Sequence, residues 1–584
     1  MRTALALVWQ AGRAQAALLV GLSVLLGVAP VFAAWMVKAF ADRLQGEGSL
    51  VLPALGIAAS TLVLLAIPAA LGYLRAELER RLSVLVNERL FTAINAQRGL
   101  RSFENPVFHN RLQLAQQGGE SAPPIVLATG MSLVESGVTL LGFTGSLLVV
   151  SPLIAVLALA AAVPGLVVER RLARAQADLA FSLSPVDRRK LFYGNLQTDE
   201  RAAKEIRLFG LGGHFLGRML GEFRTLNDAS RRMDRTILSR QLLVGGLTAA
   251  LGAVALLLVA GQAADGRLGA GDVFVIVAAL AGVQTAANGM VTTAGHLLEA
   301  LLLLGHYRDF LADTREEQDG DAPCPPLREG IELRDVWFRY SPEHPWVLEG
   351  VTLRIAAGEA VALVGLNGAG KSTLVKLLCR LYDPERGAIL WDGADLRTFS
   401  VASLRRRVGT VFQDFMEYDL SAAENVALGD VERLTDRAAV EAAAAGAGVD
   451  GVLRALPRGY ETLLSRIFAD GEEAGVELSG GQWQRIAVAR MLMRPDPDLL
   501  ILDEPSAGLD AEAEHELHQR LLERRAGTTS VLISHRLSAV AMAERIIVLS
   551  GGRVLETGSH AELLAASGEY ARLFTLQASG YRDA

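Results

Sequence analysis

Long apolar stretches recur through the N-terminal half of this chain and limit its fold more strongly than any other feature. A helix needs about 20 apolar residues to cross the hydrocarbon core of a membrane. We therefore predict six membrane spans, near Ala16–Val37, Leu50–Leu74, Ile125–Val150, Leu153–Val168, Leu242–Ala260 and Val273–Met290. The first apolar run is longer than a typical signal-peptide core, so we expect it to be a retained anchor.

The composition indicates two unlike halves. Hydrophobic residues make up 51% of the 584 residues and charged residues 21%, which is too apolar for an ordinary soluble enzyme and too charged for a purely membrane-buried protein. The length allows two or three domains. The net charge of −7 comes without a basic run, so no nucleic-acid partner is expected. Cys324 and Cys379 lie far apart without metal-ligand spacing, which suits a reducing compartment.

The charges between the spans predict an orientation. The connection after the second span is basic and carries, among others, Arg75, Arg80, Arg81, Arg89, Arg98 and Arg101. The connection after the fourth span is also strongly basic, whereas the intervening connections are short or nearly neutral. By the positive-inside rule we expect a multi-pass protein of the cell membrane with both termini in the cytoplasm. The two basic connections contain little Pro or Gly, so we expect them to continue the spans as helical stalks.

Two polar features fall within the predicted spans. Glu135 lies near the middle of the third span, where an ionised carboxylate is costly unless it is paired or faces water. Gln284, Asn288, Thr292 and Glu299 follow one another at helical spacing along the sixth span and beyond it. Either feature could line a wet substrate pathway, and either could instead serve helix–helix contacts.

The composition changes at residues 311–329, which are acidic and rich in proline. We interpret this segment as a linker between a domain at 1–310 and a domain at 330–584. Beyond it, short apolar runs alternate with helical patterns, which predicts strand–helix units around a mostly parallel sheet.

The segment "GLNGAGKST" after the apolar run 360–364 has the pattern of a phosphate-binding loop. Its glycines let backbone N–H groups surround phosphates at a helix start, where the helix dipole favours anions. Lys371 is expected to bridge the outer phosphates, and Ser372 to ligate Mg²⁺. The predicted loop residues are Gly365, Leu366, Asn367, Gly368, Ala369, Gly370, Lys371, Ser372 and Thr373.

Four further side chains suit phosphate hydrolysis. Asp503, at the end of the apolar run 499–502, is placed to hold the Mg²⁺ shell. Glu504 beside it can act as the general base toward an attacking water. His535 follows another apolar run and could contact the γ-phosphate, and Gln413 on a predicted loop could supply an oxygen to Mg²⁺.

A second anion-binding helix start follows at "LSGGQ", with Ser479, Gly480, Gly481 and Gln482. Two helix starts could hold opposite sides of one phosphate. The sequence spacing alone leaves open whether one chain brings both to the same nucleotide.

Residues 331–575 resemble the nucleotide-binding domain of ATP-binding cassette (ABC) transporters. In order along the chain, Tyr340 resembles the A-loop aromatic that stacks on adenine, "GLNGAGKST" the Walker A motif, Gln413 the Q-loop, "LSGGQ" the signature and "LLILDE" Walker B. "SAGLD", which ends in Asp510, resembles the D-loop, and His535 the switch histidine. In this family the signature of one domain closes over ATP held by the Walker A loop of another, which implies a dimer.

The N-terminal half resembles the six-span membrane domain of ABC exporters, and residues 103–116 and 202–211 resemble its coupling segments. The segment before the signature departs from the family pattern, since Glu473 fits and its neighbours Glu472 and Ala474 differ. The resemblance implies an all-α transmembrane domain followed by an α/β P-loop nucleotide-binding domain.

The function implied by the resemblance is ATP-driven export by a dimeric half-transporter that uses ATP and Mg²⁺. The expected partners are a second copy of the chain or a paralogous half-transporter, membrane lipid and a cargo that the sequence does not identify. A lipid flippase with the same engine and a membrane-anchored ATPase sensor that moves no cargo are the alternatives.

Overall fold

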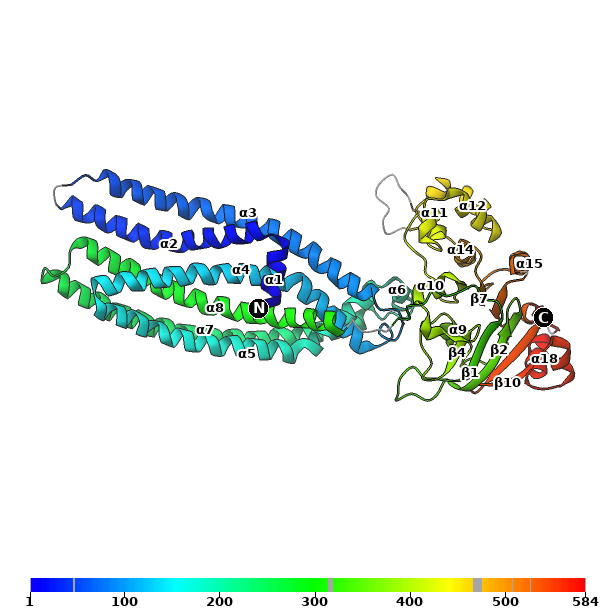
Figure 1. The fold of residues 1–584 in the computed structure, drawn as a ribbon. Helices are drawn as coiled ribbons and strands as arrows, with labels where there is room; N and C mark the ends of the chain where they lie inside the picture. Colours follow the sequence, from blue (N-terminus) through cyan, green and yellow to red (C-terminus); the bar gives the residue numbers. More distant parts are fainter. Residues whose placement is uncertain are drawn as a thin grey trace. The chain divides into compact units, whose positions relative to one another are not determined.

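The computed structural model describes residues 2–45, 48–313, 319–465, 475–506, 508–525 and 527–582. The chain forms two compact units, which Figure 1 draws as ribbons. The first unit comprises Met1–Ala96 and Pro106–Arg315, and the second comprises Gln97–Asn105 and Glu316–Ala584. The second unit is therefore built from two stretches of sequence that lie far apart in the chain.

Long helices make up the first unit. Among the described residues, six of these helices are long and apolar enough to cross a membrane, as judged by length and composition, which agrees with the six predicted spans. The helices are α1 (Arg2–Ala11), α2 (Arg13–Leu44), α3 (Val51–Asn95), α4 (Pro106–Val150), α5 (Pro152–Thr198), α6 (Glu200–Leu208), α7 (Gly212–Ala264) and α8 (Ala270–Asp313). The stretches that join the second span to the third and the fourth to the fifth are mostly helical, as predicted.

Small residues let α4 pack closely against α8. A Cβ atom added to Gly118 on α4 would lie 2.2 Å from the carbonyl oxygen of Leu303 on α8. A Cβ added to Gly282 on α8 would lie 2.3 Å from the ring of Phe143 on α4. Close backbone approach at small residues is the usual basis of helix association in membranes, where no hydrophobic driving force acts between helices.

The second unit is an α/β domain with two sheets. The larger sheet has the strand order β10-β9-β3-β8-β7-β6 and is parallel except for β10. The smaller sheet is antiparallel and has the order β2-β1-β4-β5. The strands are β1 (Gly330–Phe338), β2 (Leu348–Ala356), β3 (Ala360–Val364), β4 (Arg386–Trp391), β5 (Ala394–Asp395), β6 (Val408–Val411), β7 (Leu499–Asp503), β8 (Thr529–Ile533), β9 (Arg545–Ser550) and β10 (Arg553–Gly558).

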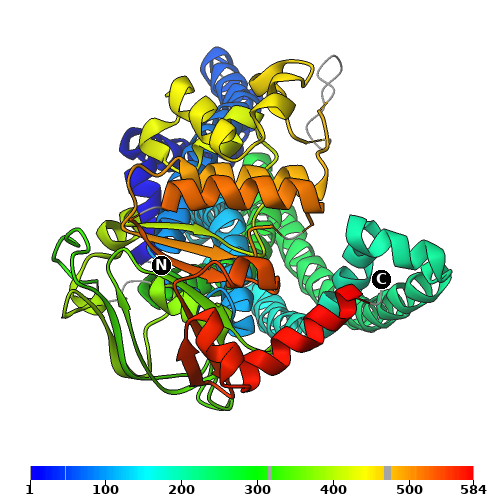
Figure 2. The ribbon, with the colours of Figure 1, turned by 90° about the vertical axis from the view of Figure 1, so that its right-hand side faces the viewer.

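Helices cover the larger sheet on both sides, so its central strands are mostly apolar and are buried along their length. In Figure 2 the helices coloured yellow and the red C-terminal helix lie on opposite sides of this sheet. The helices are α9 (Lys371–Leu378), α10 (Val401–Arg406), α11 (Ala422–Ala427), α12 (Arg437–Gly446), α13 (Asp450–Arg454), α14 (Gly480–Leu492), α15 (Ala511–Arg525), α16 (Leu537–Val540), α17 (His560–Ala565) and α18 (Glu569–Arg582). This architecture confirms the predicted α/β fold of the C-terminal half.

Candidate functional site

The phosphate-binding loop connects β3 to α9 at one edge of the larger sheet. Gly370 is the N-cap of α9 with φ +101°, a conformation that side-chain-bearing residues rarely adopt. A Cβ at this position would also lie 2.6 Å from Cδ2 of Leu348. Only glycine therefore fits. The first N–H groups of a helix have no acceptor within the helix, so those of α9 are available to a phosphate at this loop.

Lys371 opens α9 and is 8% exposed. Its Nζ donates hydrogen bonds to the carbonyl oxygens of Gly365, at 2.7 Å, and Leu366, at 3.1 Å. Burial lowers the pKa of the Lys371 ammonium, and the negative charges of Glu504 and Asp503 counteract that effect. The ammonium thus lies at the loop's own backbone with two carboxylates close enough to act on it.

Ser372 and Asp503 lie beside the loop, close enough for the Ser372 hydroxyl to act on the Asp503 carboxylate. Asp503 is 5% exposed, and this burial raises its pKa, whereas the neighbouring Ser372 hydroxyl lowers it. A hydroxyl and a carboxylate side by side are oxygen donors of the kind that Mg²⁺ prefers. The donor set present therefore fits this metal.

Glu504 follows Asp503 at the carboxyl end of β7 and has φ +51°. Its Oε1 lies 2.8 Å from Nε2 of His535, and its Oε2 accepts a hydrogen bond of 3.2 Å from Nε2 of Gln413. Gln413 follows β6 and His535 follows β8, so three parallel strands deliver these side chains to the same edge of the sheet. The structure thus brings together the predicted base Glu504, the predicted phosphate contact His535 and the predicted Mg²⁺ ligand Gln413.

Tyr340 follows β1 and is half-buried. Its hydroxyl lies 2.9 Å from Oγ1 of Thr373 in α9, which places the ring beside the helix that starts at the phosphate loop. The rings of Phe338 and Tyr382 contact it edge-on, with centroid distances of 5.1 Å and 5.4 Å. This position suits an aromatic ring that stacks on a nucleotide base.

The signature segment forms the start of α14 as predicted. The Ser479 hydroxyl accepts from Gln482 N and the Gln482 side chain accepts from Ser479 N, which is a reciprocal capping box. A Cβ on Gly481 would lie 3.2 Å from the carbonyl oxygen of Gly508, so the signature lies against the segment that ends in Asp510. Asp510 itself caps α15 by accepting from Ala513 N at 2.8 Å.

The two predicted phosphate-binding segments lie apart in the part of the chain that the structure describes. Among the residues that the structure describes, no hydrogen bond or ion pair links Ser479–Gln482 to Gly365–Thr373. Glu472, Glu473 and Ala474, where the sequence departs from the family pattern, lie outside the described residues.

Gln484 is a further residue at this site, and no sequence motif predicts it. This residue is 1% exposed in α14, and its Nε2 donates to the backbone carbonyl oxygen of Glu504 at 3.3 Å. It therefore ties the signature helix to the segment that carries the predicted base. Its position in the first turns of the helix that contains Gln482 is the one sequence feature that could have indicated a role at this site.

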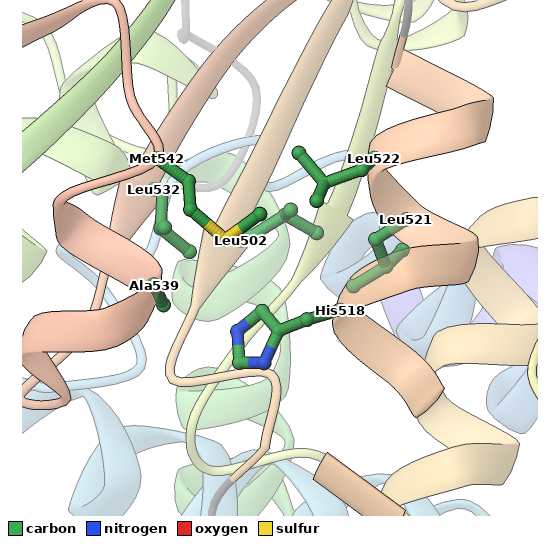
Figure 3. Close-up of a pocket in the computed structure, with 7 residues that line it drawn as sticks. All are labelled: Leu502, His518, Leu521, Leu522, Leu532, Ala539 and Met542. Carbon is green, nitrogen blue, oxygen red and sulfur yellow. The ribbon is translucent and has the colours of Figure 1, made fainter. Parts of the chain in front are cut away.

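An apolar pocket lies between β7, β8 and α15 (Figure 3), lined by Leu502, His518, Leu521, Leu522, Leu532, Ala539 and Met542. Histidine is the only polar side chain in that lining. A nucleotide phosphate needs several N–H or cationic donors, so this pocket does not suit one.

In the first unit, Glu135 on α4 is half-buried. The positive charge of Arg75 on α3 attracts the Glu135 carboxylate. A Cβ on Gly289 would lie 3.3 Å from Oγ of Ser136, next to Glu135 in the chain. Asn288 is exposed on α8, and Gln284 is half-buried one turn earlier. The predicted polar residues of the third and sixth spans thus lie on two helices that pack together.

Residues 348–507 match the ABC transporter family. Among curated proteins, the chain is 42% identical over 299 residues to the cyclolysin secretion/processing ATP-binding protein CyaB of Bordetella pertussis, covering 49% of this chain and 41% of that protein. It is 43% identical over 265 residues to the ATP-dependent lipid A-core flippase of Alkalilimnicola ehrlichii, covering 45% and 44% of the two chains. The matched region spans somewhat under half the length of these relatives.

Among solved structures, a bacterial Atm1-family ABC exporter with ATP bound has a TM-score of 0.81 and 25% sequence identity. That similarity covers 96% of this chain and 98% of the exporter. The order of membrane helices followed by an α/β domain is thus shared over nearly the whole length.

Proposed function

Because this chain belongs to the ABC transporters, with six membrane-span candidates ahead of the nucleotide-binding domain, we propose that it is an exporter half-transporter driven by ATP hydrolysis. The cargo would leave the cytoplasm or the inner leaflet, and the chain would lie in the cytoplasmic membrane with both termini inside.

The observation that carries this proposal is the contact of Glu504 with His535 and Gln413 at the edge of the sheet where Lys371, Ser372 and Asp503 also lie. Glu504 would accept the proton of the attacking water, with His535 holding the carboxylate in place. Lys371 and the backbone N–H groups of α9 would bind the phosphates.

Ser372, Asp503 and Gln413 would hold Mg²⁺. The metal would supply positive charge to the phosphate oxygens during hydrolysis. The nearness of the Ser372 hydroxyl to the Asp503 carboxylate supports this assignment.

A dimer would complete each nucleotide site. The Ser479–Gln482 helix start lies against the Gly508–Asp510 segment of its own chain. Within the described residues it forms no hydrogen bond to its own phosphate loop. Two copies facing each other would let the signature of one bind the phosphates held by the other. ATP would then favour the closed pair, and this difference in affinity would drive alternating access in the membrane domain.

A lipid flippase is the second candidate, and the similarity to proteins named lipid A-core flippases favours it. Such a protein would take its cargo sideways from the bilayer. A membrane-anchored ATPase that senses without transport would hydrolyse ATP with no flux.

The test uses the full chain in sealed proteoliposomes, with ATP turnover and vectorial flux measured on the same sample. A panel of labelled lipids, hydrophobic drugs and peptides provides the cargo, and Glu504→Gln is the inactive control. Flux that requires ATP and is absent in the control supports export, and the class that stimulates turnover separates lipid from soluble cargo. Turnover without flux of any class supports the sensor instead.

A further inference from the structure

Residues Gln97–Asn105, which connect α3 to α4 in the sequence, fold as part of the second unit. Leu100 N donates to the carbonyl oxygen of Leu381 at 3.0 Å, and the Leu100 side chain packs on the core of that unit. The guanidinium of Arg405 donates to the carbonyl oxygen of Arg98 at 2.7 Å, and Arg98 forms an ion pair of 2.9 Å with Asp319. Backbone and side-chain bonds therefore fix this segment on the nucleotide-binding domain.

Glu104 in this segment is bound by two side chains near α9. Its Oε1 lies 2.9 Å from Nζ of Lys376, and its Oε2 accepts a hydrogen bond from the Tyr382 hydroxyl. Burial alone would raise the pKa of Glu104, but the bonds from Tyr382 and Lys376 outweigh it and hold the pKa below its usual value. The carboxylate is therefore ionised at neutral pH.

Both partners of Glu104 contact Tyr340. The Lys376 ammonium lies 5.2 Å from the centroid of the Tyr340 ring and 5.8 Å from that of Tyr382. The rings of Tyr340 and Tyr382 meet edge-on at 88°. Cation–ring and edge-to-face contacts each contribute to holding a ring in one orientation. Glu104 thus fixes two of the groups that surround Tyr340.

We propose that Glu104 is a positioning residue for the base of the nucleotide, acting on Tyr340 through Lys376 and Tyr382. This inference rests on the proposed function, because it assigns Tyr340 to the base. Glu104 touches neither the phosphate loop nor Glu504 in the described part of the chain, so its effect falls on base binding and leaves phosphate binding and the chemical step unchanged. A binding surface oriented in advance costs less to order when the ligand arrives.

The geometry separates this role from a purely structural one. The Glu104 side chain is 43% exposed, and an ion pair at such a site contributes little to stability. Glu104→Gln keeps the size of the side chain and is therefore expected to fold. It removes the charge that holds the Lys376 ammonium beside the ring.

The experiment uses the full chain in nanodiscs and compares wild type with Glu104→Gln. We expect KM for ATP to rise about three- to tenfold, with kcat staying within about twofold of wild type. The reason is that the variant loses an interaction made equally in the ground state and the transition state. The inhibition constant of inorganic tripolyphosphate, a probe without a base, is expected to stay the same. Glu349→Gln is the matched control, because Glu349 forms an ion pair of 2.9 Å with Arg553 on the same unit.

A double-mutant cycle identifies the route of the effect. In a Tyr340→Ala background, Glu104→Gln is expected to change KM no further. An unchanged KM in the single variant, or an equal shift for tripolyphosphate and ATP, overturns the inference while leaving the proposed function intact. Wild-type protein that fails to hydrolyse ATP would instead defeat the proposed function, and with it the assignment of Tyr340.

Discussion

Nε2 of His535 lies 2.8 Å from Oε1 of Glu504, although 31 positions separate the two residues in the chain. The contact follows from the parallel pairing of β7 with β8, which brings the carboxyl ends of the two strands side by side. Histidine therefore fixes the direction of the carboxylate proposed to receive the proton of water.

Glu504→Gln tests that role. The amide keeps the size of the side chain and loses the basic oxygen, so we expect ATP binding to persist and turnover to fall by about 100-fold or more. Phosphate release and binding of labelled ATP by the full chain in nanodiscs measure the two quantities. Near-normal turnover would remove Glu504 as the base.

Lys371→Ala tests the phosphate loop. The ammonium lies at the loop backbone, where it donates to the carbonyl oxygens of Gly365 and Leu366. Its removal would delete charge-assisted hydrogen bonds to a phosphate bound there. We expect the affinity for ATP to fall by at least about tenfold, a change of 1.4 kcal/mol. Equilibrium binding of a fluorescent ATP analogue provides the measurement. An unaltered dissociation constant would count against this loop as the phosphate site.

Gly118→Ala tests the packing of α4 against α8. The added methyl would lie 2.2 Å from the carbonyl oxygen of Leu303, which forces the helices apart. Overpacking of this kind costs about 1–3 kcal/mol. Thermal unfolding in nanodiscs checks the prediction, with Gly145→Ala on the same helix as the control, because a Cβ there meets no atom within 4 Å. Equal stability of the two variants would contradict the packing described above.

Asp392→Asn tests the hydrogen bonds between the Asp392 carboxylate and the backbone at the start of β1. The carboxylate accepts from the backbone N–H groups of Arg328, Glu329 and Gly330 at 2.7–2.9 Å. An amide would turn an NH₂ group toward one of these donors, so we expect a loss of about 1–3 kcal/mol of unfolding free energy.

The same site predicts a pH dependence. Burial alone would raise the pKa of Asp392, but the three backbone donors outweigh burial and lower it. Because the folded pKa lies below the unfolded one, this stabilisation is present above the unfolded pKa and disappears as the pH falls through the folded pKa. The difference in unfolding temperature between wild type and Asp392→Asn should therefore shrink in acid, as calorimetry at neutral and acidic pH would show. A constant difference would argue against the carboxylate as the cause.

Local patterns in the sequence were enough to predict the six membrane helices and the α/β domain. Apolar length and strand–helix alternation are local properties, and the glycine pattern places the phosphate loop after β3. The meeting of Ser372 with Asp503, and of Glu504 with Gln413 and His535, depends on the order of parallel strands. The sequence motifs alone do not give the order of the strands. These contacts could be expected only from the resemblance to a known family.

The contacts of Glu104 could not be predicted from the sequence. Tyr382 lies 278 positions away from it, and a lone glutamate, lysine and tyrosine carry no periodicity or spacing. Gln484 was missed for a related reason, because its hydrogen bond runs to a backbone atom of Glu504 that any residue type would offer.

The second unit contains one segment that precedes α4 in the sequence, Gln97–Asn105, and one that follows α8, Glu316–Ala584. The Arg98–Asp319 ion pair links these two segments. The polypeptide from α4 to α8 is therefore attached to the second unit at both of its ends. A protease that cuts the backbone once between α4 and α8 would leave both fragments attached to the second unit. A C-terminal fragment that begins at residue 316 would lack the Leu100 side chain that packs on its core.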